Sequence, residues 1–175
     1  MPRNETIKYE VVKQDGIFEL RKYDDILLAS TKTNVQNRNE SGFNNVFQFI
    51  SGENSSNTKI SMTTPVVTYQ EEEILTTGFY VPSIYDGTTV PKPTSDKVFL
   101  NTIDQALFVV VTFNGAWVAS NYEHYEKLLN DYIKDNNYIV TSNKYIFRYQ
   151  APYIPDHLKR NEIAFKIQDT ILETK

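Results

Sequence analysis

One carboxylate near the C-terminus is placed where it could do chemistry. Glu162 opens the last apolar strand of the chain, and strict alternation puts it on one face with Ala164 and Lys166. Three large apolar side chains occupy the other face. A carboxylate inside a β-protein is costly unless it is paired or used. Glu162 is therefore either a surface carboxylate paired with Arg148 or Arg160, or a buried one that binds a cation or acts as a base.

Two basic residues and one methionine could instead contact an acidic or apolar ligand. Lys159 and Arg160 directly precede the Glu162 strand, and an arginine fork matches the geometry of a carboxylate. Met62 lies three residues before Pro65. A methionine in such a place usually fills a gap in the core, but it can also line an apolar pocket or approach iron axially.

The two histidines give little support for a metal site. His124 lies near the start of an expected helix, off its apolar stripe, which indicates a solvated side chain. His157 follows Pro155 and Asp156 in a loop, where it is either a polar loop residue or an iron ligand. No HExxH motif and no histidine, cysteine or carboxylate cluster is present, so we predict no zinc or other protein-bound metal.

Composition disfavours several classes of function. The 175 residues carry a net charge of −4, with a pI near 5.2, and lack a basic nucleic-acid footprint. No apolar run is long enough for a membrane span, and the polar first residues lack a signal core, which favours a cytoplasmic protein. Cysteines are absent, as are G-x-S-x-G, Walker and dinucleotide motifs.

The elements that must position these residues occur twice along the chain. Phe18 and Ile26 lie 81 positions before Phe99 and Leu107, and in each case two strands precede an amphipathic helix. A single repeat of this length favours one pseudo-symmetric domain over a solenoid. We predict one domain over 1–175, with pseudo-repeats at about 7–81 and 98–168 and a connector at 82–97.

The sequence indicates the apolar face and the ends of both predicted helices. The first is predicted over 42–52, with Phe43, Val46, Phe47 and Ile50 on its apolar face and Gly52 just after its end. The second is predicted over 121–135, started by a capping box of Ser120 and Glu123. Its apolar stripe is Tyr125, Leu128, Leu129, Tyr132 and Ile133. Strands are predicted over 7–13, 17–22, 25–34, 59–69, 74–81, 98–103, 106–114, 138–150 and 162–168.

Six short segments, in order along residues 7–168, resemble the SOUL/haem-binding protein family. Each is short, but together they cover nearly the whole chain. They are Tyr9-Glu-Val-Val, Phe18-Glu-Leu-Arg-Lys-Tyr23, Lys59-Ile-Ser-Met-Thr-Thr-Pro-Val66, Phe79-Tyr-Val-Pro82, Phe113-Asn-Gly115 and Arg160-Asn-Glu-Ile163.

The resemblance implies an α+β fold. Two duplicated βαββ halves would form a distorted antiparallel β-barrel with two flanking helices. It also implies a non-enzymatic carrier or buffer of haem or another tetrapyrrole, or of another small hydrophobic ligand, held loosely in an apolar groove. The residues that would contact this cofactor are Lys59, Met62, Lys159, Arg160 and His157. Histidine ligation from the N-terminal half, used in one branch of the family, has no counterpart here because no histidine precedes His124.

Two other functions fit the same architecture. Members of the family resemble bacterial GyrI-like effector-binding domains, whose central pocket takes drug-like molecules beside a glutamate. Glu162 matches that glutamate, with Tyr80 and Tyr145 as pocket walls. A cationic aromatic ligand would then be sequestered. A hydrolase would instead use Glu162 as its general base.

Overall fold

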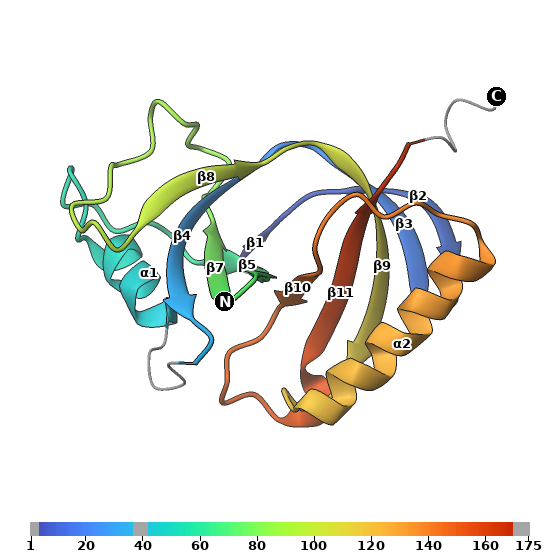
Figure 1. The fold of residues 1–175 in the computed structure, drawn as a ribbon. Coiled ribbons are helices and arrows are strands. Elements are labelled where there is room, and N and C mark those ends of the chain that lie inside the picture. The colour runs from blue at the N-terminus through green and yellow to red at the C-terminus, as the bar shows by residue number, and fades with distance from the viewer. Residues whose placement is uncertain (1–3, 37–41, 170–175) are drawn as a thin grey trace. The chain divides into compact units, whose positions relative to one another are not determined.

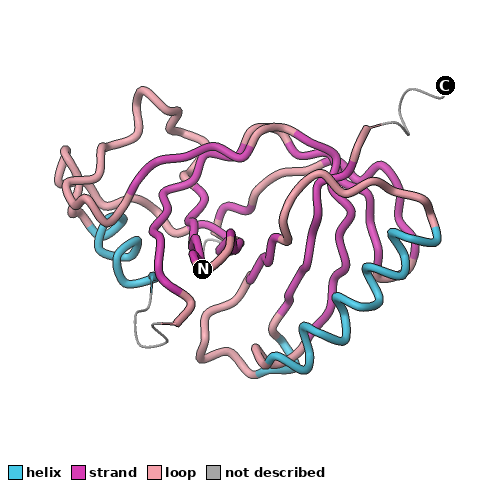
Figure 2. The backbone as a smooth tube through the Cα atoms, viewed as in Figure 1, coloured by secondary structure: helices cyan, strands magenta, loops and turns pink. Residues whose placement is uncertain are grey.

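The computed structural model describes residues 4–36 and 42–169. Contacts divide the chain into two compact units, each built from two segments. Unit 1 comprises residues 1–7 and 25–103, and unit 2 comprises residues 8–24 and 104–175. Each unit contains an antiparallel sheet and one α-helix (Figures 1 and 2). The first hairpin of the chain therefore belongs to the same unit as the C-terminal strands.

Unit 1 is built on four antiparallel strands in the order β6-β7-β4-β8. A short parallel pair, β1 with β5, accompanies them. Residues 59–62 of the predicted strand over 59–69 are irregular, and Pro65, which follows a cis peptide bond, breaks the rest into β5 and β6 as its position predicts. The strands are β1 (Glu5–Thr6), β4 (Ile26–Asn34), β5 (Thr63–Thr64), β6 (Val66–Glu71), β7 (Ile74–Tyr80) and β8 (Phe99–Ile103).

Helix α1 (Gly42–Ser51) covers the core of unit 1 with half of its predicted stripe, since Val46 and Ile50 are buried as predicted but Phe43 and Phe47 are not. Phe43 and Phe47 stack on each other and are 38% and 47% exposed, whereas Phe49 is buried. The helix turns this way because Gly42 packs directly on β4: a Cβ there would lie 2.8 Å from the side chain of Thr31. Only a residue without a side chain allows that approach. The predicted helix end holds, since Gly52 follows Ser51 directly.

Unit 2 is built on five antiparallel strands in the order β2-β3-β9-β11-β10. Its central strand β9 spans the residues predicted for it, and its apolar run from Leu107 to Val111 is buried throughout. A run without alternation is typical of a strand covered on both faces. The strands are β2 (Glu10–Asp15), β3 (Phe18–Tyr23), β9 (Ala106–Asn114), β10 (Tyr145–Arg148) and β11 (Arg160–Ile167).

Helix α2 (Ala119–Asp135) lies on one face of this sheet (Figure 1). Leu129 and Ile133 pack against a core that includes Ile163 and Ile167, as the alternation in β11 predicts. The predicted capping box is wrong. The helix begins after Val118, which makes no side-chain cap, and Ser120 lies within its first turn. A local motif of this kind fixes a helix start only to within a residue or two.

The region predicted as a strand over 138–150 is mostly irregular. Only β10 (Tyr145–Arg148) is a strand, and Val140 forms an isolated bridge with Ile167. The predicted fold class is nevertheless confirmed: antiparallel strands with two flanking helices form an α+β protein. None of the helices in the described parts of the chain is long and apolar enough to cross a membrane.

Any residue other than glycine would be strained at position 115, in the turn between β9 and α2. The φ of Gly115 is +139°, and an added Cβ would lie 2.5 Å from the Asn121 amide nitrogen. The Asn161 side-chain amide also donates to the Gly115 carbonyl oxygen at 3.0 Å. We expect Gly115→Ala to cost about 1–3 kcal/mol in the free energy of unfolding, measured by urea denaturation. Gly87→Ala, in open space, should change it by less than about 0.5 kcal/mol; equal effects would contradict this.

Candidate functional site

Glu162 lies in β11 on the face of the unit 2 sheet opposite α2. It is directly opposite Thr112 of β9 and Phe147 of β10 in the strand register. Its side chain is fully buried, as is its neighbour on the same face, Ala164. The alternation of β11 thus does what the sequence predicts: the apolar side chains meet α2, and the carboxylate lies on the other side. The reading of Glu162 as a solvated surface carboxylate is wrong.

Five donated hydrogen bonds saturate the Glu162 carboxylate. Arg21 of β3 donates to both oxygens, with Nη1 2.8 Å from Oε1 and Nη2 2.5 Å from Oε2. The Tyr149 hydroxyl donates to Oε1 at 2.6 Å. Oε2 also accepts from Thr112 Oγ1 at 2.8 Å and from Arg160 Nη2 at 2.9 Å. A carboxylate offers about four lone-pair positions, so no acceptor capacity remains.

A second layer of side chains holds the two arginines. Arg21 Nε donates to Glu19 at 2.9 Å, and Arg21 Nη1 donates to the Tyr23 hydroxyl at 2.8 Å. The Arg21 guanidinium also lies 4.0 Å from the centre of the Tyr9 ring. The two arginines and the two glutamates balance in charge. We call this group the Glu162 cluster: Tyr9, Glu19, Arg21, Tyr23, Thr112, Tyr149, Arg160 and Glu162.

The charge states within the cluster follow from its contacts. Burial acts to raise the pKa of Glu162, but hydrogen bonds and charge from Arg21, then the charge of Arg160, outweigh it and lower the pKa to about 2. Burial, with the neighbouring Glu162 charge, raises the pKa of Tyr149. Burial likewise raises the pKa of Tyr23 although Arg21 opposes it. At neutral pH Glu162 is therefore ionised, and Tyr23 and Tyr149 are neutral.

Three of the residues predicted from the sequence lie together on this face of the sheet. Arg160 and Glu162 are bonded within the cluster. Tyr145 of β10 lies opposite Ala164 in the register, one residue pair along from Glu162, with its ring 5.7 Å from that of Phe108.

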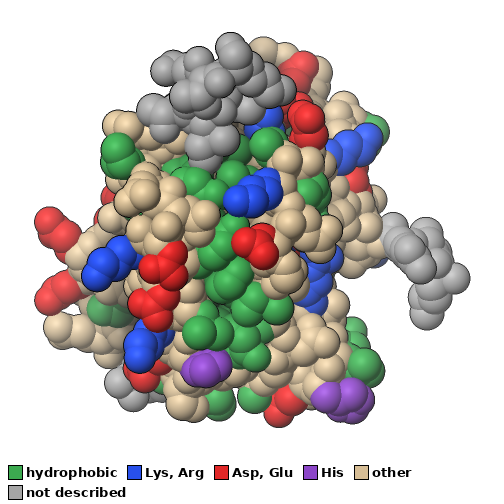
Figure 3. Space-filling view, turned by 90° about the vertical axis from the view of Figure 1, so that its right-hand side faces the viewer, with side chains coloured by type: hydrophobic (Ala, Val, Ile, Leu, Met, Phe, Trp, Pro, Cys, Tyr) green, Lys and Arg blue, Asp and Glu red, His purple; other side chains and the backbone are tan. Residues whose placement is uncertain are grey.

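The other predicted residues of unit 2 lie apart from the cluster. Lys159 is buried, but its Nζ pairs with Asp156 at 3.0 Å and lies 4.6 Å from the centre of the Trp117 ring. His157 lies in the short 3-10 helix η1 (Asp156–Leu158) and is exposed. His124, on α2, is exposed as predicted, and both histidine side chains are visible on the surface in Figure 3.

The remaining predicted residues belong to unit 1. Lys59 is exposed, and Tyr80, the last residue of β7, is half-buried. Met62 is 38% exposed, so its interpretation as core filler is wrong. The reason is local: Met62 precedes β5, whose own inward residue is Thr63, which donates to the carbonyl of Tyr80.

Sequence reasoning missed most of the cluster, above all Arg21. One signal was available. In Phe-Glu-Leu-Arg-Lys-Tyr, alternation puts Glu19, Arg21 and Tyr23 on one face of a strand, and the other face begins with the apolar Phe18 and Leu20. Arg21 is 0% exposed, which for an arginine requires a buried anionic partner. An arginine that shares one face of a strand with a glutamate therefore indicates a buried ion pair.

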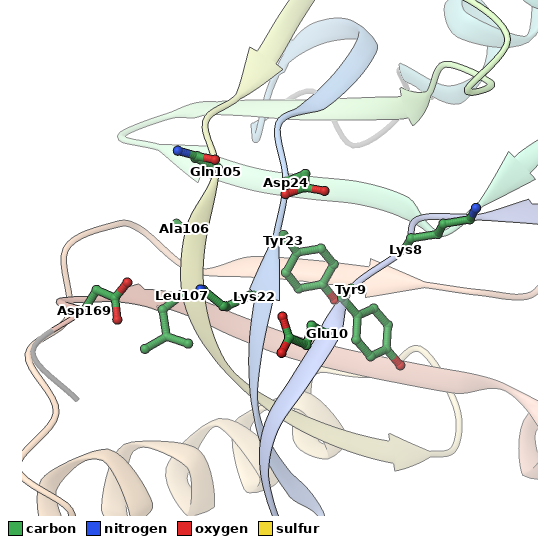
Figure 4. Close-up of a pocket in the computed structure, with 10 residues that line it drawn as sticks. All are labelled: Lys8, Tyr9, Glu10, Lys22, Tyr23, Asp24, Gln105, Ala106, Leu107 and Asp169. Atoms are coloured by element: carbon green, nitrogen blue, oxygen red, sulfur yellow. The ribbon is translucent and has the colours of Figure 1, made fainter. Parts of the chain in front are cut away.

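A pocket of about 490 Å³ adjoins the cluster at one end of the unit 2 sheet (Figure 4). Tyr9 and Tyr23, whose ring centres are 5.2 Å apart, belong to both. The rest of the lining is largely charged, so this pocket is not the apolar groove that the sequence predicts. The lining residues are Lys8, Tyr9, Glu10, Lys22, Tyr23, Asp24, Gln105, Ala106, Leu107 and Asp169.

Two solved structures share this fold over most of the chain. The C-terminal domain of EcmrR has a TM-score of 0.66 at 14% identity, covering 91% of this chain and 98% of that domain. A hydrolase from Listeria innocua has a TM-score of 0.63 at 6% identity, covering 90% and 94%. SAV2435 bound to tetraphenylphosphonium is less similar, with a TM-score of 0.52 at 13% identity and coverage of 90% and 97%. At these identities the likeness is one of fold alone.

Sequence comparison is more specific. Heme-binding protein 2 of Mus musculus is 25% identical over 172 residues, covering 91% of this chain and 82% of the mouse protein. Heme-binding protein 2 of Homo sapiens is 29% identical over 126 residues, covering 66% of this chain but only 60% of the human protein. The SOUL heme-binding protein family matches residues 4–166. Because that match extends over nearly the whole chain, the protein belongs to the SOUL heme-binding family.

Proposed function

We propose that this protein binds haem or a related tetrapyrrole and does no chemistry on it, as a carrier or buffer does. Membership of the SOUL family supports the ligand class. The absence of chemistry is supported by the hydrogen bonding of Glu162, the buried carboxylate that a hydrolase would use as its general base. All of its acceptor positions are taken by protein donors.

A hydrolase that uses Glu162 as general base is disfavoured by the same contacts. A general base needs an open lone pair near the substrate and a pKa near the working pH. Glu162 has no open lone pair, and its pKa is held at about 2. The Listeria protein described as a hydrolase shares the fold at 6% identity, and this fold supports more than one function.

A receptor for a cationic ligand is disfavoured by charge. SAV2435 has been solved bound to tetraphenylphosphonium, a cation, and Glu162 is the residue that would face such a ligand here. In this chain Glu162 already has Arg21 and Arg160 as counter-ions. A cation at that place would find the carboxylate already paired and would meet the partly exposed guanidinium of Arg160. An anionic ligand, such as a tetrapyrrole with carboxylate side chains, suits those charges better.

The residues proposed to contact the tetrapyrrole can be ranked by their exposure and by whether they already have a partner within the protein. Lys159 is bound to Asp156, and so is a weak candidate for a ligand carboxylate. Lys59, Met62 and His157 are exposed and remain proposals. Arg160 is partly exposed, with 37% of its side chain accessible, and is the strongest candidate. When bound, haem would supply iron redox and ligand chemistry, and this chain would supply its apolar and anionic contacts.

Titration with hemin tests the proposal. We expect a shifted Soret band and quenching of Trp117 fluorescence with a saturable isotherm. Free hemin controls and an unrelated protein of similar charge would correct for nonspecific adsorption. A spectrum that stays that of free hemin at every protein concentration would rule the function out.

Hemin binding should not depend on histidine. His124 and His157 are both exposed side chains of unit 2, and neither belongs to the Glu162 cluster. Replacing both with alanine is expected to leave the dissociation constant within about fivefold, which is less than about 1 kcal/mol. The Soret position should also be unchanged. If His157→Ala alone abolishes the protein-induced shift of the Soret band, the iron is ligated by that histidine.

A further inference from the structure

We propose that Arg160 and Tyr9 form a binding subsite for one carboxylate group of the ligand. This deepens the proposed function and rests on it for the identity of the whole ligand. The starting observation is an imbalance in the Glu162 cluster. The acceptors of Glu162 are saturated, but some donors of the cluster are not.

Of the three guanidinium nitrogens of Arg160, only Nη2 donates to a residue that the structure describes. Nη2 donates to Glu162 Oε2 at 2.9 Å and to the Tyr9 hydroxyl oxygen at 3.3 Å. Nε and Nη1 have no partner among residues 4–36 and 42–169. A guanidinium has five N–H donors, so most of its donor capacity remains. Since 37% of the side chain is exposed, those donors are accessible to a ligand.

The Arg160 guanidinium is also held in place before any ligand binds. It lies 4.2 Å from the centre of the Tyr149 ring, while Glu162 and Tyr9 hold Nη2. An arginine on the surface usually samples many rotamers, and fixing them on binding costs affinity. Here the buried carboxylate has already fixed the orientation, which is the arrangement that a specific anion receptor requires.

Tyr9 supplies a second donor at the same place. Its hydroxyl oxygen accepts from Arg160, and the hydroxyl proton has no acceptor in the described part of the chain. Tyr9 is partly exposed. A carboxylate that accepts from both Arg160 and the Tyr9 hydroxyl would satisfy these groups together. Charge-assisted bonds of this kind are stronger than neutral ones.

The alternative cations of this region fit less well. Lys159 already pairs with Asp156. Arg148 also stacks on aromatic rings, at 5.2 Å from Tyr122 and 5.4 Å from Trp117, but its strand position is on the opposite face from Glu162. Arg148 therefore provides a matched control: the same residue type, half-buried and stacked, but outside the cluster.

The first experiment compares hemin with its dimethyl ester, which has no free carboxylates. The wild-type protein should bind hemin at least about tenfold more tightly than the ester. Arg160→Gln should lose that preference, weakening hemin binding about tenfold and leaving ester binding unchanged, and Tyr9→Phe should weaken hemin binding about threefold. Arg148→Gln should behave as wild type. Circular dichroism would check that each variant is folded.

A second experiment on the wild-type protein separates the subsite from the tetrapyrrole function. Sodium propionate would be titrated while the Nε–H signals of the arginines are followed by ¹⁵N NMR. We expect the Arg160 signal to shift in a saturable way and the Arg148 signal to stay. If hemin fails to bind but propionate shifts Arg160, the proposed function is wrong and the subsite stands. If hemin binds wild type and Arg160→Gln equally, or propionate leaves Arg160 unmoved, the subsite is overturned.

Discussion

Replacing Arg21 with alanine is expected to destabilise the protein by about 3–5 kcal/mol, the largest effect of any single polar substitution considered for this chain. The side chain is fully buried and donates two of the five hydrogen bonds to Glu162, and a third and fourth to Glu19 and Tyr23. Without it Glu162 keeps its charge but loses its main counter-ion, and a cavity is left in its place. Urea denaturation at neutral pH would measure the loss.

A neighbouring lysine gives the control for this substitution. Lys22→Ala, next in β3 but exposed, should change the free energy of unfolding by less than about 0.5 kcal/mol. A double-mutant cycle then tests the cause. Arg21→Met combined with Glu162→Leu should cost less than the sum of the two single changes, because neither leaves the other as an unpaired buried charge. Additive costs would mean that packing around Arg21, and not its charge, is what matters.

The importance of Arg21 also shows where reasoning from this sequence stops. Local patterns located β9 to the residue and α2 within two residues of its start, because five consecutive apolar residues and a clear helical stripe are strong signals. The same reasoning failed over 138–150, where a polar stretch at 141–144 separates two apolar runs and only the second forms a strand, β10. It also placed Phe43 and Phe47 of α1 in the core, although both are exposed. The side of α1 that faces the core depends on the close contact of Gly42 with β4.

The candidate site divides in the same way. Alternation within one strand placed Glu162 on the face opposite the apolar side chains of β11, but its full burial is visible only in the structure. Its partner Arg21 is 141 positions away, and their contact depends on the registers of β3 with β9 and of β9 with β11. Registers of this kind are set by packing across the whole sheet, and alternation within one strand cannot supply them.

The saturation of Glu162 changes what its substitution should do. If Glu162 only faced a ligand pocket, Glu162→Gln would alter ligand binding more than stability. With two arginines bonded to the carboxylate, we expect a loss of stability, since glutamine keeps one acceptor but removes the charge that both arginines face. Any effect on ligand binding would then act through the orientation of Arg160.

This loss should depend on pH in a defined direction. The pKa of Glu162 is about 2 in the folded protein, against an ordinary value of 4.5, so as pH falls the unfolded chain takes up the proton first. The stabilisation is therefore complete above about pH 4.5 and is lost as pH falls toward 2, by about 3 kcal/mol for a shift of this size.

Urea denaturation of wild type and Glu162→Gln at several pH values would isolate this contribution, because the other carboxylates titrate in both proteins. We expect the difference in stability to be largest at neutral pH and to shrink by most of that amount between pH 4.5 and 2. A difference that stays constant over this range would mean that the carboxylate is not held ionised by Arg21 and Arg160, and that the cluster contributes through packing alone.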